Sequence, residues 1–160
     1  MTRRRRGVAF AALLLLAAPS LSAQGSRVVP EARFDAIVVR RTAVQAALGA
    51  DVALSPEIHF ELAAGVGASA GRGPAAGLSA RTDAIVRFLV DPGHTMRWSP
   101  YIGGGIGARY DRGPEWRGVA ILVAGASGPR WGHWMPFVEA GLGGGVRLGF
   151  GVRRAASPRR

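Results

Sequence analysis

Apolar side chains alternate with polar or small side chains along most of the chain. In residues 44 to 54 every second position is apolar, from Val44 to Leu54, and the positions between carry Ala, Gln, Gly and Asp. A repeat of two residues predicts β-strands with one apolar face and excludes an amphipathic helix, whose repeat is about 3.6 residues. The same alternation recurs in residues 57 to 68, 78 to 90, 101 to 110 and 138 to 152.

Short segments rich in Gly, Pro, Ser and charged residues separate the alternating runs. Seven such connections predict eight strands, of which the first is short and lies at about Arg33 to Val39. Six long strands are the alternative, because the alternation keeps its phase through two of the connections. Strands of about twenty residues would, however, be much longer than a membrane is thick. The expected connections are residues 40–42, 55–56, 69–76, 91–99, 111–115, 128–135 and 143–145.

The length of the strands and the character of their less apolar face favour a membrane barrel. Strands of roughly 9 to 14 residues are long for a soluble sheet and suit a tilted strand that crosses about 25 Å of hydrocarbon. The less apolar face carries many Gly and isolated charges of both signs, as a narrow lumen requires. We therefore expect an all-β, antiparallel up-and-down transmembrane β-barrel. The residues expected to face lipid near the bilayer midplane are Leu48, Leu62, Ala84 and Ile106.

Aromatic residues are expected to form two belts at the membrane surfaces, where amphipathic rings prefer to lie. With a periplasmic N-terminus, Tyr110 and Trp116 mark the outer rim. The periplasmic belt is expected to contain Phe34, Phe60, Phe88, Trp98, Tyr101, Trp131, Trp134 and Phe137.

Residues 1 to 23 have the three parts of an export signal. A cationic segment ends at Arg6, twelve apolar or small residues follow, and small residues lead to an expected cleavage after Ala23. A membrane-spanning helix is excluded, because Pro19 interrupts the run before the roughly 20 residues that a span needs. The expected organisation is a signal peptide (1–23), a periplasmic leader (24–32), an outer-membrane barrel (33–154) and a basic tail (155–160).

Composition removes several classes of function. The chain has 24 Gly, 10 Pro and no Cys, so a helix bundle, a disulfide framework and thiolate chemistry are all excluded. All 21 basic residues are Arg, against 10 acidic residues. Removal of the signal takes four Arg away and leaves 17 basic and 10 acidic residues, a net charge of +7. A nucleic-acid partner is not expected, because no basic stripe is interleaved with aromatic residues and export leads away from nucleic acid.

Two segments resemble strand motifs of small bacterial outer-membrane β-barrels. They are S-P-Y-I-G-G-G-I-G-A-R-Y-D at residues 99–111 and P-F-V-E-A-G-L-G-G-G-V-R-L-G-F-G-V-R at 136–153. With the signal and the alternation, they make about Arg33 to Arg154 similar to the eight-stranded group that includes the membrane domain of outer membrane protein A. This resemblance implies an outer-membrane monomer inserted by the barrel-assembly machinery. The chain departs from the family in its end, which is basic where the family usually has a terminal aromatic residue.

One cluster of ionisable residues is expected inside the barrel. Glu57, His59 and Glu61 share one face, and the expected hairpin registers bring Asp51 and Arg87 beside His59. We interpret the five residues as a structural ion cluster, because buried charges in a narrow lumen must be paired. A lipid A acyl transferase or deacylase is the enzymatic alternative. However, the inward Ser79 on the neighbouring strand lies about seven residues, or some 23 Å, from His59.

Four arginines are expected towards the outer end of the barrel. Their guanidinium groups suit bidentate contact with the phosphates of lipopolysaccharide. Neutralisation within the lumen by Asp111 and Glu115 is the equal alternative. The four residues are Arg72, Arg109, Arg112 and Arg117.

The function expected from these observations is that of a non-enzymatic outer-membrane barrel with a filled lumen. It would have a structural or surface-interaction role and no open pore, because eight strands leave room only for side chains. Its expected partners are outer-membrane lipid and lipopolysaccharide, with no cofactor, no metal and no catalytic residue. A lipid-modifying enzyme and a soluble, lipocalin-like periplasmic carrier are the alternatives.

Overall fold

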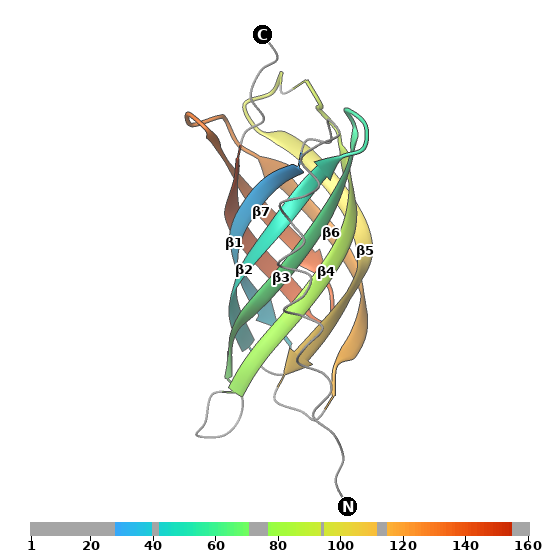
Figure 1. The fold of residues 1–160 in the computed structure, drawn as a ribbon, viewed down its shortest axis with the longest axis vertical. Coiled ribbons are helices and arrows are strands. Elements are labelled where there is room, and N and C mark those ends of the chain that lie inside the picture. The colour runs from blue at the N-terminus through green and yellow to red at the C-terminus, as the bar shows by residue number, and fades with distance from the viewer. Residues whose placement is uncertain (1–27, 40–41, 71–76, 94, 112–114, 155–160) are drawn as a thin grey trace, which may run out of the picture.

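A computed structural model describes residues 28–39, 42–70, 77–93, 95–111 and 115–154. These residues form eight antiparallel strands in sequence order, and pairing of the first strand with the last closes the barrel (Figure 1). No helix that is long and apolar enough to cross a membrane occurs among them. The strands are β1 (Val28–Val38), β2 (Thr42–Ala53), β3 (Ile58–Ala70), β4 (Gly77–Leu89), β5 (Ser99–Asp111), β6 (Arg117–Ser127), β7 (Trp134–Leu142) and β8 (Val146–Arg154).

The barrel confirms eight strands, and the alternative of six long strands is wrong. At residues 143–145 the chain turns sharply, with the backbone N–H of Gly143 bonded to the carbonyl of Gly145. Gly144 has a φ of 66°, a conformation that L side chains rarely adopt. The unbroken alternation at this point therefore reflects a phase-preserving three-residue turn. The centre of the first connection, residues 40–41, lies outside the described residues.

Strand β1 begins at Val28, five residues before the expected start at Arg33. Residues 28–32, assigned from the sequence to the leader, therefore belong to the barrel. Residues 28–30 pair with β2 only, since the pairing of β1 with β8 starts at Glu31. Pro30 is tolerated there because a proline fits a strand position that lacks a partner on one side.

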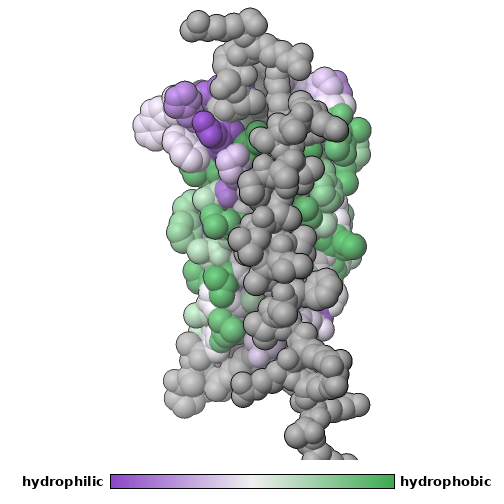
Figure 2. Space-filling view, viewed as in Figure 1, coloured by the Kyte–Doolittle hydropathy of each residue, from purple (hydrophilic) through white to green (hydrophobic). Residues whose placement is uncertain are grey.

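The apolar face of each strand points outward, as the alternation predicts. Leu48 and Ile106, two of the residues expected at the midplane, are 64% and 70% exposed. Gln45 and Glu61, on the opposite face, are buried. Figure 2 shows the result where the wall is coloured: apolar residues predominate along the length of the barrel, and hydrophilic residues gather at its upper end.

The two ends of the barrel differ in their connections. We call the end at which β1 begins and β8 ends the proximal end (uppermost in Figure 1); it carries residues 54–57, 90–98 and 128–133. The opposite end, called distal, carries the β5–β6 and β7–β8 connections. Tyr110 and Trp116 pack together there, with ring centroids 5.9 Å apart.

The aromatic belt that the sequence predicts at the periplasmic rim corresponds to the proximal end, and this prediction is partly wrong. Phe60, Phe88, Trp98, Trp131 and Trp134 lie at or next to the proximal strand ends. Phe34 instead lies in the middle of β1, where its ring stacks on Phe150 at 5.8 Å. Tyr101 and Phe137 point into the barrel and are buried, because they occupy the inward phase of the alternation.

Candidate functional site: the charged interior

Charged side chains gather inside the barrel. Among the described residues six arginines and six strand carboxylates are buried on the inner face. The two charges balance, as they must where water is scarce. The arginines are Arg33, Arg81, Arg87, Arg109, Arg147 and Arg153, and the acids are Glu31, Asp35, Asp51, Glu61, Asp83 and Glu139.

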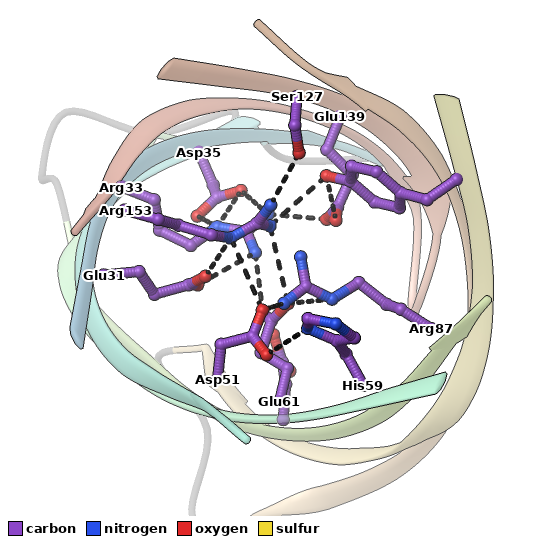
Figure 3. A network of polar contacts seen from close by, with 12 residues as sticks. Glu31, Arg33, Asp35, Asp51, His59, Glu61, Arg87, Ser127, Glu139 and Arg153 are labelled. Atoms are coloured by element: carbon purple, nitrogen blue, oxygen red, sulfur yellow. Dashed lines mark hydrogen bonds and ion pairs between the residues drawn. The ribbon is translucent and has the colours of Figure 1, made fainter. Parts of the chain in front are cut away.

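Arg33 is the centre of the network (Figure 3). Its guanidinium donates to Asp35 at 2.9 Å, to Glu61 at 2.9 Å and to Glu139 at 2.6 Å. These acids come from β1, β3 and β7, so a single side chain ties together strands that are not neighbours in the sheet. Planar guanidinium groups suit this role because their five donors can serve several carboxylates at once.

A second group of contacts links β1, β4, β7 and β8. Arg147 donates to Asp83 at 2.8 Å and also to Glu139. Arg81 donates to Asp35 at 2.5 Å and lies 3.2 Å from Asp83. Asp35 and Glu139 therefore join this group to the one around Arg33.

The cluster expected around His59 is assembled with one exception. His59 Nδ1 lies 2.8 Å from Asp51, Arg87 donates to the other Asp51 oxygen, and Arg87 Nε lies 3.2 Å from Glu61. His59 faces Arg87 across β3–β4 in the expected register. Across β2–β3 the register differs by two residues, so Asp51 faces Glu61 and not His59.

Glu57 does not join this cluster. Glu57 precedes β3 and is exposed, and the hydroxyl of Ser55 donates to its carboxylate at 3.1 Å. Glu57 lies in the turn formed with Ser55 and Pro56, so His59 is the first residue of β3 that faces inward.

Sequence reasoning missed an aromatic part of the interior. Arg153 lies over the ring of Phe137, 3.8 Å from its centroid, and over Tyr101 at 5.3 Å. Arg87 also lies over Tyr101, at 5.2 Å. The Tyr101 hydroxyl donates to Glu139 at 3.1 Å. Ring faces attract cations, so both rings stabilise buried guanidinium groups. The alternation could have predicted this feature, because it places Tyr101 on the face that points into the barrel.

The distal interior holds a separate polar chain. Gln45 donates to Ser79 at 2.6 Å, and Ser79 donates to Asp111 at 2.6 Å. Arg109 lies 2.5 Å from Asp111 and donates to the carbonyl of Gly144 at 3.2 Å. Arg109 is thereby held between β5 and the β7–β8 turn.

The four arginines expected to contact lipopolysaccharide have different placements. Arg109 is buried, whereas Arg117 is exposed and lies directly opposite it in the β5–β6 pairing. Arg72 and Arg112 fall outside the described residues.

The Ser79–His59 pair considered for the enzymatic alternative is not assembled. Ser79 faces Gly67, eight positions along β3 from His59, and the two are therefore about 26 Å apart at roughly 3.3 Å per residue. Each is bonded to different partners. Among the described residues, no group of three or more His, Cys, Asp or Glu side chains is placed to hold a metal ion.

Glycine makes room for the crossing side chains. A Cβ on Gly149 would overlap the Asp35 carboxylate and lie 3.0 Å from Arg33, so a side chain at this β8 position would displace the central arginine. In the G-G-G-I-G and G-L-G-G-G runs, Gly107 and Gly141 are packed as closely, because a Cβ there would lie 2.8 Å from Ile121 and 2.9 Å from Val123.

Comparisons with known proteins identify the fold. The crystal structure of Neisserial surface protein A matches with a TM-score of 0.60 and 12% identity, over 79% of this chain and 94% of that one. A de novo designed transmembrane β-barrel matches with a TM-score of 0.52 and 17% identity, over 81% of this chain and 94% of that one. No protein-family model and no curated protein sequence matches the chain. The chain therefore has the eight-stranded fold of small outer-membrane β-barrels.

Proposed function

We propose that this protein is a non-enzymatic outer-membrane barrel whose lumen is sealed by its ion network. Its role is structural or one of surface interaction, and transport through a pore is not part of it. The observation that carries the proposal is the set of contacts from Arg33 to acids of β1, β3 and β7. These contacts cross the space that an ion would have to pass.

Three further points support the proposal. An eight-stranded barrel has an interior just wide enough for side chains. An apolar outer wall, with Leu48 and Ile106 largely exposed, suits lipid and argues against a soluble carrier. The expected export signal at residues 1–23 provides a route to the outer membrane.

Conductance in planar bilayers tests the seal. The mature protein is expected to show no stable current steps. Replacing Glu139 and Arg147 with Ala removes two crossing side chains and is expected to raise ion leakage. Leu148→Ala is the matched control, because Leu148 neighbours Arg147 on β8 but faces outward. Large, reproducible current steps from the unaltered protein would refute the seal. An unchanged ion leakage in the double variant would also refute it. Heat-modifiable gel migration checks that each variant is folded.

A second function, contact with lipopolysaccharide at the distal end, is favoured by the pairing of Arg109 with Arg117. Like charges directly opposite each other in a sheet are unfavourable, and Asp111, 2.5 Å from Arg109, offsets the charge of Arg109. Arg117 is exposed and forms no ion pair with any described residue, and its guanidinium group suits a phosphate.

Lipopolysaccharide binding tests this second function. Arg117→Gln is expected to weaken binding of lipopolysaccharide but not of its dephosphorylated form. Arg154→Gln, at the proximal end, is the control. Equal binding of both lipids by the unaltered protein would contradict the proposal.

A further inference from the structure

A pocket of about 630 Å³ lies at the proximal end, between two connections of the barrel. One connection joins β4 to β5, and the other joins β6 to β7. None of its lining residues belongs to the ion network of the interior. The lining residues are Gly93, Thr95, Met96, Arg97, Gly128, Pro129, Arg130 and Met135.

The pocket is positively charged and partly apolar. Arg97 and Arg130 are exposed, no carboxylate lines the pocket, and neither arginine has an ion-pair partner in the part of the chain that the structure describes. Met96 and Met135 add an adaptable apolar surface. The lining therefore suits an anionic group attached to an apolar body.

The nearest acid, Asp91, is occupied by its own loop. One carboxylate oxygen accepts from the backbone N–H of Met96 at 2.7 Å, and the other accepts from the Thr95 hydroxyl at 3.0 Å. These bonds leave Arg97 available, because they direct the carboxylate into the turn. They also fix the backbone on which Thr95, Met96 and Arg97 line the pocket.

The two connections pack against each other. A Cβ on Gly128 would lie 3.1 Å from the ring of Trp98, so the ring rests on this glycine. The second connection is closed by two backbone bonds between Trp131 and Trp134, of 2.7 and 3.0 Å. The walls of the pocket are therefore formed before any ligand binds.

Three exposed tryptophans lie in the same two connections or directly after them. Trp131 is 84% exposed, and Trp98 and Trp134 are about half exposed. Tryptophan is enriched at the headgroup level of membranes. The pocket thus lies on segments that carry the side chains expected at a membrane surface.

We propose that this pocket binds the headgroup of an anionic phospholipid in the leaflet at the proximal end. The phosphate lies between Arg97 and Arg130, which can each donate two parallel hydrogen bonds to it. Met96 and Met135 contact the glycerol and the first carbons of the acyl chains. The inference rests on the membrane location given under Proposed function, but not on the sealed lumen.

Lipid retention measured by native mass spectrometry tests the site. The mature protein, folded in neutral detergent micelles, is offered phosphatidylglycerol or phosphatidylcholine at equal concentration. Both lipids carry the phosphate, but the choline cation would lie beside the two arginines, so phosphatidylglycerol is expected to be retained roughly tenfold more. Arg97→Gln and Arg130→Gln should each reduce this preference towards that of phosphatidylcholine.

Arg154→Gln is the matched control. Arg154 is also exposed at the proximal end, opposite Trp134 in the β7–β8 pairing, but it does not line the pocket. The preference should survive this change, and all variants should keep heat-modifiable migration. An equal loss in the Arg154 variant would overturn the site, because it would indicate general charge attraction.

Two other results would also overturn the proposal. Equal retention of both lipids by the unaltered protein would show that the pocket does not select a charge. Displacement of phosphatidylglycerol by an equal concentration of inorganic phosphate would assign the pocket to a free anion. Conductance of the same preparations, measured separately, distinguishes failure of this site from failure of the sealed lumen.

Discussion

The interior of the barrel has two walls that are built on different principles. Strands β1 to β4, β7 and β8 contribute the charged network around Arg33. Between Tyr101 and Arg109, β5 contributes only glycine to the interior, and β6 contributes Val119, Ile121 and Val123. Ile121 and Val123 pack with Ile85 of β4 in the apolar cluster of the interior.

The comparison shows how a narrow barrel can be filled in two ways. On the apolar wall, the glycines of β5 let neighbouring side chains approach closely: a Cβ on Gly107 would lie 2.8 Å from Ile121. On the charged wall, each long side chain needs partners from several strands. Loss of one side chain should therefore have local effects on the apolar wall and distributed effects on the charged wall.

The largest effect is expected from Arg33→Ala. The change leaves Asp35, Glu61 and Glu139 without their shared partner, and orphaning buried charges costs about 3–5 kcal/mol. Urea unfolding in lipid vesicles, followed by tryptophan fluorescence, measures the free energy of unfolding. A loss below about 1 kcal/mol would mean that water replaces the arginine, and the distinction between the walls would fail.

A double-mutant cycle on Asp51 and Arg87 is expected to show coupling. The two side chains are bonded directly, so Asp51→Asn and Arg87→Ala should deviate from additivity by about 0.5–3 kcal/mol. Ile37→Val with Ile121→Val serves as the comparison pair and should be additive, because Ile37 lies outside the apolar cluster that contains Ile121. Additive energies for the charged pair would refute the register deduced for this part of the lumen.

A smaller effect is expected from Ile121→Val alone. The change removes one methylene from the packing with Ile85 and Val123 and should cost about 0.5–1.5 kcal/mol in the free energy of unfolding. Measured in the same vesicles as Arg33→Ala, it calibrates the apolar wall. If it cost as much as the arginine, the two walls would not differ in energetic terms.

The sequence predicted the fold more completely than the site. Alternation determines which face each residue takes, so it correctly placed Arg87 on the inner face and left Leu48 on the lipid side. The expected β3–β4 hairpin register also correctly placed Arg87 opposite His59. Alternation could not predict the exact β2–β3 register, because it does not reveal how many residues the turn before His59 contains. For the same reason Glu57 was wrongly counted as inward.

Partnerships across the lumen lie outside what alternation can predict. Arg33 and Glu139 are 106 residues apart and meet only because the barrel closes. Arg153 and Phe137 meet on neighbouring strands, yet their contact depends on how far each side chain reaches inward. Sequence periodicity gives the direction of a side chain, whereas its partner depends on the diameter and shear of the closed sheet.

Asp91, in the β4–β5 connection, differs from the carboxylates of the interior, because its hydrogen-bond partners are all close in sequence. The backbone N–H of Met96 is the main reason that the pKa of Asp91 lies below its usual range, and bonds from Thr95 and Ser99 add to it. Its ionised form therefore stabilises the β4–β5 connection above the unfolded pKa of about 3.9, and this contribution is lost as pH falls through the lower folded pKa. The chemical shift of the Met96 amide, followed by NMR from neutral pH downward, should change in that acidic window while strand amides stay in place. Asp91→Asn should abolish the step. A step that persists in this variant, or one that spreads to the strands, would show that the connection is coupled to the interior network and that the contrast between local and distributed charge does not hold.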